Sequence, residues 1–295
     1  MSFFPFRSEK AKKEYAAFYS DKSKGWPIAS ENRMLNTSFG DTYIKVSGPS
    51  GAPPLVLLAN NSLAWMGSIK ILSKSFRTYV IDNIFGFGLS VPKRKAKCSG
   101  DYVLWLDEVL NGLGLSHDIN LVGQFKGGWI AAMYAVKNNN RVKKLILISP
   151  NATILPFSFI FHIWIILLSM PLRIFTILYI NTIFKEYIRL SKSLKLIAKN
   201  IADEIYFERH SYIRQEVHEN VLTDKEMASL GSSVYLIIGS NEIMYSAKDA
   251  KMRTLNLLPH AKVDVLEDVG HEILMAKSSV VNAMMNNYLL GKNDI

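Results

Sequence analysis

The 295-residue chain has a single cysteine, Cys98, which excludes an internal disulfide framework. One thiol suits a reducing compartment. The first residues also lack the apolar core and cleavage site of a signal peptide before charges begin at Arg7 and Glu9. We therefore expect a cytoplasmic protein.

Acidic residues are scarcer than basic ones, with 25 Asp and Glu against 35 Lys and Arg and a formal net charge of +10. This balance favours anionic partners in general. The basic residues are spread along the chain, however, without a base-reading motif or interleaved stacking aromatics. We expect no nucleic-acid partner, and we predict neither a cofactor nor a bound metal.

Apolar residues make up 49% of the chain, enough for a sizeable core. Short apolar runs alternate with helical patterns, which is typical of a parallel sheet covered by helices on both faces. The predicted strands cover residues 42–47, 55–58, 78–81, 119–122, 145–149, 234–238 and 263–266. The pattern predicts an α/β protein with a mostly parallel central sheet.

The alternation stops after Pro150 and resumes near Val234. The intervening residues carry no strand-helix alternation of their own, so we predict a helical insertion that covers one end of the sheet. The predicted organisation is a core domain formed by residues 1–150 and 231–295, with a helical cap at 151–230.

Residues 151–172 contain no Asp, Glu, Lys or Arg, and by length they qualify as a membrane-span candidate. Pro156 and Ser158 interrupt this stretch, and the strands before and after it must join one sheet. We therefore favour a cap helix whose large side chains, between residues 154 and 168, face the mouth of an apolar pocket. The alternative is peripheral membrane contact through 154–168, and a true span is the least favoured.

A five-residue turn, Gly123-Gln124-Phe125-Lys126-Gly127, joins an apolar strand to a helical pattern. This is the setting of a nucleophile elbow, in which the central residue of G-x-S-x-G attacks the substrate. A phenyl ring has no lone pair to attack a carbonyl and no proton to give up, so acyl-enzyme chemistry is excluded at this position. We expect neither serine-type ester hydrolysis nor labelling by a fluorophosphonate.

The central residue of such a turn usually adopts a positive φ, which costs a bulky side chain about 1–3 kcal/mol. Two outcomes follow for Phe125. Either it keeps the strained conformation with its ring filling the site, or the turn has relaxed and moved the ring aside. The flanking Gly123 and Gly127 favour survival of the tight turn.

Four further segments match the motifs of one superfamily. Residues 53–58 resemble the strand before an oxyanion loop, 82–90 (DNIFGFGLS) a D-x-x-G-x-G-x-S loop, 239–242 the loop of a triad acid, and 268–271 the Gly-His turn of a triad histidine. With the elbow and the cap, the chain resembles the α/β-hydrolase superfamily, in particular its small bacterial members with a helical cap. The resemblance extends from about residue 42 to the C-terminus and implies the α/β-hydrolase fold.

The resemblance assigns Glu242 as the acid and His271 as the base, in the order that this fold uses. A glutamate in place of aspartate still accepts a hydrogen bond from the imidazole and fixes its tautomer. Asp249 and Asp268 are the other candidates for the acid.

The oxyanion region departs from the superfamily pattern. Members usually carry His-Gly after the third strand, where this chain has Asn60 and Asn61, and often a histidine before the nucleophile, where it has Gln124. The backbone N–H of Lys126 still supplies half of an oxyanion hole. Together with Phe125, these departures indicate relaxed or redirected selection on the site.

Three functional hypotheses follow. The first is a lyase, isomerase or cyclase that uses His271, oriented by Glu242, as a general base on an apolar small molecule without a covalent intermediate. The second is a non-catalytic protein that binds an apolar ligand and has a regulatory role. The third is a hydrolase that uses a water activated by histidine or another hydroxyl nucleophile. Candidate hydroxyls are those of Ser62, Ser90, Tyr245 and Ser246. The sequence slightly favours an enzyme.

Overall fold

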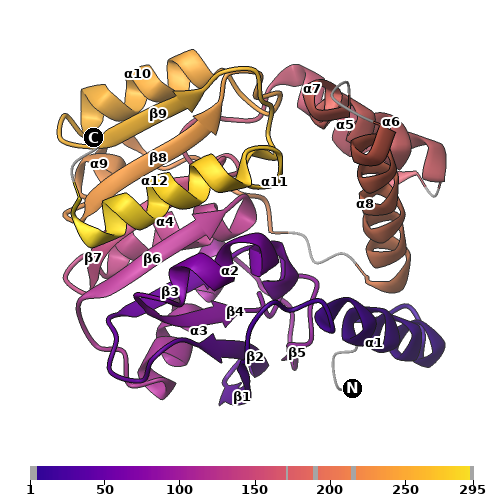
Figure 1. Ribbon diagram of the computed structural model, residues 1–295, viewed down its shortest axis with the longest axis horizontal. Helices are drawn as coiled ribbons and strands as arrows, with labels where there is room; N and C mark the ends of the chain where they lie inside the picture. Colours follow the sequence, from indigo (N-terminus) through magenta and orange to yellow (C-terminus); the bar gives the residue numbers. More distant parts are fainter. Residues whose placement is uncertain (1–4, 171, 189–191, 214–216, 293–295) are drawn as a thin grey trace.

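The computed structural model describes residues 5–170, 172–188, 192–213 and 217–292, so parts of the predicted cap (171, 189–191 and 214–216) lie outside the described residues. The described strands form a nine-stranded sheet in the order β1-β2-β4-β3-β6-β7-β8-β9, with β5 paired to β2 (Figure 1). The strands are β1 (Glu31–Thr37), β2 (Gly40–Ser47), β3 (Pro54–Leu58), β4 (Arg77–Ile81), β5 (Val91–Pro92), β6 (Ile119–Gln124), β7 (Val142–Ile148), β8 (Ser233–Gly239) and β9 (Lys262–Leu266).

All seven predicted strands are present, and from β4 to β9 neighbouring strands pair in parallel. Two strands were not predicted. β1 has mostly polar residues and lies exposed at the sheet edge, antiparallel to β2. β5 has only two residues. Both lack the apolar run that identifies a buried strand.

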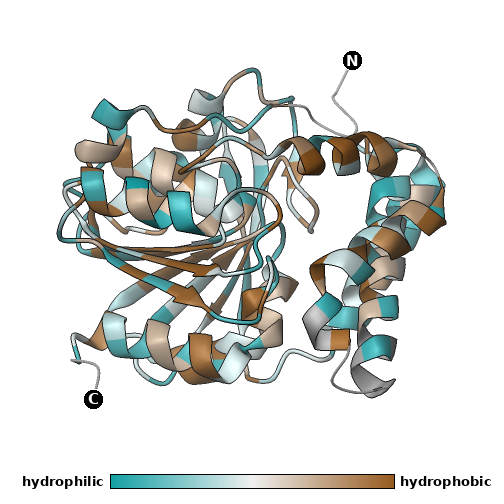
Figure 2. Ribbon diagram, turned by 90° about the horizontal axis from the view of Figure 1, so that it is seen from above, coloured by the Kyte–Doolittle hydropathy of each residue, from teal (hydrophilic) through white to brown (hydrophobic). Residues whose placement is uncertain are grey.

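The parallel strands read as continuous apolar runs because both of their faces are buried. In β3, Val56 and Leu58 pack into one core cluster, and the alternating Leu55 and Leu57 pack into another on the opposite face. The helices that supply these two clusters lie on either side of the sheet (Figure 2). The fold is therefore a mostly parallel sheet covered on both faces, as the sequence predicts.

Helices α2, α3, α4, α10 and α12 belong to these covering layers, and α5–α8 follow β7 at the end of the sheet where the parallel strands finish (Figure 1). α9 lies beside α10. The helices are α1 (Glu9–Ser23), α2 (Met66–Leu72), α3 (Ser99–Gly112), α4 (Lys126–Lys137), α5 (Phe159–Ser169), α6 (Arg173–Ile183), α7 (Lys185–Ile188), α8 (Lys192–Ser211), α9 (Asp224–Ala228), α10 (Ala247–Leu257), α11 (Ile273–Ala276) and α12 (Ser278–Leu290), with the 3-10 turn η1 (Ser62–Trp65) before α2.

The N-terminal helix α1, which was not expected from the sequence, joins α8 to the core. Its Lys22 forms an ion pair with Glu204 of α8. Its Tyr15 packs edge-on against Tyr212 just beyond α8, with ring centroids 4.8 Å apart. On the core side, the hydroxyl of Tyr19 is hydrogen-bonded to Ser62. α1 therefore holds α8 beside the loop that follows β3.

The apolar stretch at 151–172 differs from the favoured expectation. Only residues 159–169 form a helix, α5, which begins where the Ser158 hydroxyl accepts from the N–H of Phe161. Phe161 is buried, but Phe159 and Ile166 are 81% and 61% exposed, so the prediction that all large side chains face a pocket is wrong. Of the helices among the described residues, none combines the length and the apolar character needed to cross a bilayer.

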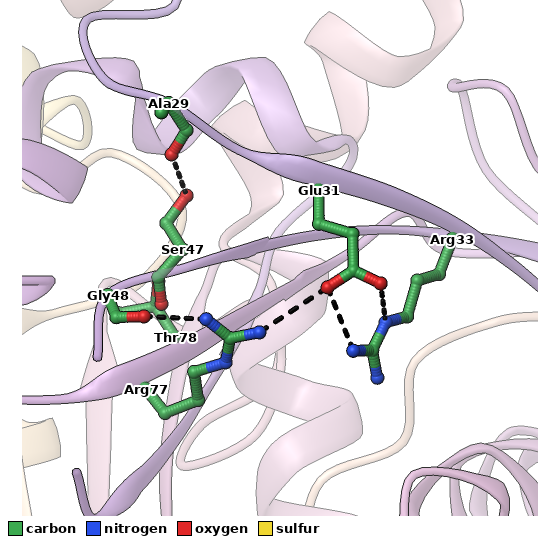
Figure 3. A network of polar contacts seen from close by, with 7 residues as sticks. All are labelled: Ala29, Glu31, Arg33, Ser47, Gly48, Arg77 and Thr78. Atoms are coloured by element: carbon green, nitrogen blue, oxygen red, sulfur yellow. Dashed lines mark hydrogen bonds and ion pairs between the residues drawn. The ribbon is translucent and has the colours of Figure 1, made fainter. Parts of the chain in front are cut away.

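A polar network ties three strands together at the edge of the sheet (Figure 3). Glu31 of β1 accepts two hydrogen bonds from Arg33, and Arg77 of β4 donates to Gly48 O after β2. Arg77 also reaches the Glu31 carboxylate at 3.4 Å. Because the Glu31 side chain is about half exposed, the network contributes little to the free energy of unfolding. We expect it to help fix the register of the strands at this edge.

Candidate active site

The turn between β6 and α4 keeps the geometry of a nucleophile elbow. Phe125 has φ 54° and ψ −120°, so it adopts the strained conformation and the turn has not relaxed. Its carbonyl accepts from Trp129 N and Asn151 N, both at 3.1 Å. A Cβ at Gly127 would lie 2.3 Å from the Leu58 backbone, so only glycine allows α4 to begin this close to β3.

His271 and Glu242 meet beyond the ends of β9 and β8. His271 Nδ1 lies 2.7 Å from Glu242 Oε2, and the two side chains are 3% and 0% exposed. The other carboxylate oxygen of Glu242 accepts from Met244 N at 3.0 Å. Asp249 and Asp268, the other candidate acids, are both exposed, and in the described part of the chain neither is hydrogen-bonded to His271. Glu242 is therefore the carboxylate that orients the imidazole.

The phenyl ring of Phe125 stacks on the imidazole of His271. The ring centroids are 4.1 Å apart and the planes are inclined by 18°. The Nε2 atom of His271 is buried and has no hydrogen-bond partner among the described residues. A buried polar nitrogen left unpaired is unusual and indicates a position for a hydrogen-bonding ligand. The site thus presents an oriented imidazole with one free proton acceptor.

A second carboxyl group lies next to this pair. Burial raises the pKa of Glu272 to about 7. The charge of neighbouring His271 lowers this pKa, and the charge of Glu242 raises it. The imidazole is hydrogen-bonded to Glu242 and, among the described residues, not to Glu272. The division of roles between the two glutamates therefore follows from hydrogen bonding rather than from proximity alone.

The predicted oxyanion residues differ in their roles. Asn60 is exposed, whereas the Asn61 side chain caps η1 through Leu63 N and donates to Glu208 of α8 at 3.1 Å. Lys126 is the first residue of α4, so its backbone N–H is one of the groups at the helix N-terminus that lack an intrahelical acceptor. Gln124 is 3% exposed, and its Oε1 has no partner among the described residues.

The Lys126 side chain contacts the chain that returns from the cap. Its Nζ lies 3.4 Å from Glu219 Oε1 and 5.3 Å from the centre of the Tyr102 ring. Three residues further along α4, Trp129 Nε1 donates to Asn220 O at 3.0 Å. The side chain of Lys126 is therefore engaged by the residues that follow the cap and by Tyr102.

The candidate hydroxyl nucleophiles are all committed elsewhere or lack a base. The hydroxyl of Ser62 is hydrogen-bonded to Tyr19, and the Ser62 N–H donates to Asp82. The hydroxyl of Ser90 donates to Asp82 O. The hydroxyl of Ser246 caps the N-terminus of α10. Burial raises the pKa of Tyr245 well above its ordinary value, and nearby Glu242 raises it further, which disfavours a phenolate. Among the described residues, none of these hydroxyls is hydrogen-bonded to His271.

Asp82 organises the two loops beside the site, a role that the D-x-x-G-x-G-x-S motif alone did not show. Its carboxylate accepts from Ser62 N at 2.5 Å and from Leu89 N at 2.8 Å. Burial raises the pKa of Asp82 to about 6, although these hydrogen bonds favour the charged form. A Cβ at Gly88 would lie 2.5 Å from its Oδ2, which explains the glycine there.

Glu208 is a second residue that the sequence analysis missed, because a lone glutamate on an amphipathic helix carries no signal. Burial raises its pKa to about 8, with further contributions from Glu204 and Asp82, while the bond from Asn61 lowers it. The folded chain therefore binds this proton more tightly than the unfolded chain does. The contribution of Glu208 to the free energy of unfolding therefore falls as the pH rises from about 4.5, its ordinary pKa, toward 8.

We expect Glu208→Gln to stabilise the protein at pH 9 and to have little effect at pH 5. The amide still accepts from Asn61 but carries no charge to bury, so the gain at high pH is about 1–4 kcal/mol. Denaturant titrations at both pH values measure this difference. Glu14→Gln, on an exposed surface of α1, is the matched control. Equal effects of Glu208→Gln at both pH values would contradict the account.

Over the described ranges, His, Cys, Asp and Glu do not gather in groups of three that would hold a metal ion.

The chain matches the family model described as alpha/beta hydrolase fold over residues 53–196. The chain is 26% identical to an uncharacterized carboxylesterase, nap, of Bacillus subtilis. The alignment covers 95% of this chain and 94% of that relative. This chain is 27% identical to carboxylesterase YbfK of the same organism, with 92% of each chain covered. The crystal structure of naproxen esterase from B. subtilis matches with a TM-score of 0.84 at 25% identity, covering 96% of this chain and 99% of that one.

The sheet, the elbow and these matches show that the chain has the α/β-hydrolase fold and is similar to α/β-hydrolases over almost its full length. They also support an enzyme. Two expectations from the sequence are corrected. The lyase, isomerase or cyclase hypothesis and its non-catalytic alternative are wrong, because the relatives that match over almost the full length are named carboxylesterases. The same finding opposes the expectation that the chain lacks esterase activity.

Proposed function

We propose that this protein hydrolyses carboxylic esters with an apolar acyl group, and that His271, oriented by Glu242, takes the proton from the attacking water. The observation that carries the proposal is the buried His271–Glu242 pair, 2.7 Å apart, with Nε2 unpartnered in a chain similar to carboxylesterases along its length. The relatives supply the reaction class, and the pair supplies a chemical route to it.

The hydrogen bond to Glu242 sets the direction of proton transfer. Because a carboxylate only accepts, it holds the proton on Nδ1 and leaves the Nε2 lone pair free. A water that donates to Nε2 becomes nucleophilic enough to attack the ester carbonyl carbon, and its proton moves to Nε2. The resulting imidazolium is stabilised by Glu242.

The tetrahedral intermediate then breaks down with balanced proton transfers. Its oxyanion accepts from the N–H of Lys126, at the positive end of the α4 dipole, and from the backbone at Asn60–Asn61 after β3. The C–O bond to the alcohol breaks, and Nε2–H returns the proton to the leaving alkoxide. One ester and one water give one acid and one alcohol, and the imidazole is regenerated.

Phe125 explains why water rather than a side chain attacks. Its ring occupies the nucleophile position and cannot form an acyl-enzyme. The ring also packs parallel to the imidazole and restrains it to the plane in which Nε2 is presented. The buried rings of Tyr179 and Tyr245 both lie close enough to Glu242 to interact with its charge, and these rings beside the pair favour an apolar acyl group. One relative is named naproxen esterase, and an ester of a bulky aromatic acid fits the same chemistry.

The test is the rate of p-nitrophenyl ester hydrolysis by wild-type protein and by His271→Gln, over acyl chains of increasing length. General-base catalysis is worth about 10²–10⁴-fold, and we expect the variant to lose a factor of this size. We also expect kcat/KM to rise with acyl length. A wild-type rate no higher than that of a correctly folded His271→Gln variant would contradict the proposal.

A further inference from the structure

Exposed apolar side chains are concentrated on two helices of the cap. Of the seventeen large apolar residues that are exposed among the described residues, eight lie between residues 159 and 178. We call these eight the α5–α6 apolar face. They are Phe159, Ile160, Ile163, Ile166, Met170, Leu172, Ile174 and Leu178. In Figure 2 one helix beside the sheet is coloured hydrophobic almost throughout, as the α5 sequence requires.

The exposed residues of α5 follow helical spacing. Phe159, Ile163 and Ile166 lie at i, i+4 and i+7, a single stripe along the helix. The opposite side carries Phe161, which is buried, together with Trp164, Ile165 and Leu168, which pack against the main core cluster. α5 is therefore apolar on two sides, and its own fold uses only one of them.

The charged residues within the sequence of this face are basic. Residues 151–185 contain Arg173 and Lys185 and no Asp or Glu. Both side chains are exposed, and Arg173 lies between Leu172 and Ile174 of the face in the sequence. An apolar surface bordered by cations is complementary to a bilayer that carries anionic headgroups.

We propose that the α5–α6 apolar face docks on the surface of a lipid bilayer containing anionic lipid. The length of α5 sets the mode of contact. Its 11 residues extend about 16 Å at 1.5 Å per residue, half of the ~30 Å hydrocarbon core, so α5 lies along the interface and does not span it. Exposed apolar side chains that gather on neighbouring segments in this way mark interaction surfaces.

The attachment of α5 places this surface close to the site. At its N-terminus, the Ser158 hydroxyl donates to Ile243 O at 2.7 Å, and Ser158 N donates to Met244 O at 2.6 Å. Both acceptors follow Glu242 in the loop that orients His271. A docked protein would therefore hold its acid loop next to the lipid, where apolar esters partition. The docking itself does not depend on the proposed hydrolysis.

Flotation with liposomes tests the proposal. The vesicles are phosphatidylcholine alone or phosphatidylcholine mixed with phosphatidylglycerol, and the variant combines Ile160→Ser, Ile163→Ser and Ile166→Ser. We expect wild-type protein to co-float with the mixed vesicles and to release at about 1 M salt, where the Debye length is about 3 Å. The triple variant should lose about tenfold or more in vesicle partitioning.

The matched control combines Met34→Ser, Leu104→Ser and Met252→Ser, which are equally exposed but lie on β1, α3 and α10. We expect this control to float like wild type. Wild-type protein that stays at the bottom with both vesicles would overturn the proposal, as would a control that floats as poorly as the triple variant. Sedimentation showing a wild-type dimer that only the α5 variant dissociates, without flotation, would assign the face to a second copy instead. Ester hydrolysis measured on the same samples keeps this outcome separate from the proposed activity.

Discussion

Phe125→Ser is expected to convert the site to a serine hydrolase, with a gain of about 10²–10⁴-fold in kcat/KM for p-nitrophenyl esters. The elbow already has φ 54° and ψ −120° at this residue, held by close packing of Gly123 and Gly127 on their neighbours. His271 Nε2 is buried, unpaired and beside the Phe125 ring. A hydroxyl on this backbone would therefore meet a base that is already oriented by Glu242.

Phe125→Ala is the matched control, because it removes the same ring without adding a hydroxyl. We expect stoichiometric fluorophosphonate labelling of Phe125→Ser, detected by intact-protein mass spectrometry, and none of Phe125→Ala. If the two variants reacted alike, the elbow would not present its central residue to the base, and our interpretation of the turn would fail.

Glu242→Gln is expected to lower kcat by about 10²–10⁴-fold. A glutamine amide offers its NH₂ to Nδ1, which shifts the imidazole proton to Nε2 and removes the acceptor that the water needs. It also leaves no charge to stabilise the imidazolium. Because the Glu242 carboxylate is fully buried, solvent does not replace it.

Asp249→Asn, a change of the same chemistry on the exposed first turn of α10, serves as the control and should leave kcat unchanged. Stopped-assay rates with matched thermal melts distinguish catalysis from unfolding. If Glu242→Gln left kcat unchanged and Asp249→Asn lowered it, the assignment of the acid would be reversed.

The sequence predicted the parallel sheet well because strands such as β3 are buried on both faces, and two buried faces leave a continuous apolar run. The resemblance to α/β-hydrolase motifs also implied that Phe125, Glu242 and His271 are neighbours. The structure explains this, because the motifs follow β6, β8 and β9, whose carboxyl ends meet at one edge. These are local signals tied to strand ends.

The parts that sequence reasoning missed depend on tertiary contacts. β1 is a polar edge strand whose identity comes from pairing with β2. Glu208 becomes notable only because α8 buries it against Asn61, 147 residues away in the chain. The orientation of α5 was also mispredicted, because an all-apolar helix has no polar side to indicate which face is buried.

The central claim, that a water activated by His271 attacks the ester without an acyl-enzyme, is tested most directly by measuring ester turnover after incubation with excess fluorophosphonate. We predict that wild-type protein keeps its full rate and shows no adduct by intact-protein mass. We also predict that the His271→Gln variant lacks the activity. A stoichiometric adduct on a serine, accompanied by loss of ester hydrolysis, would contradict the claim.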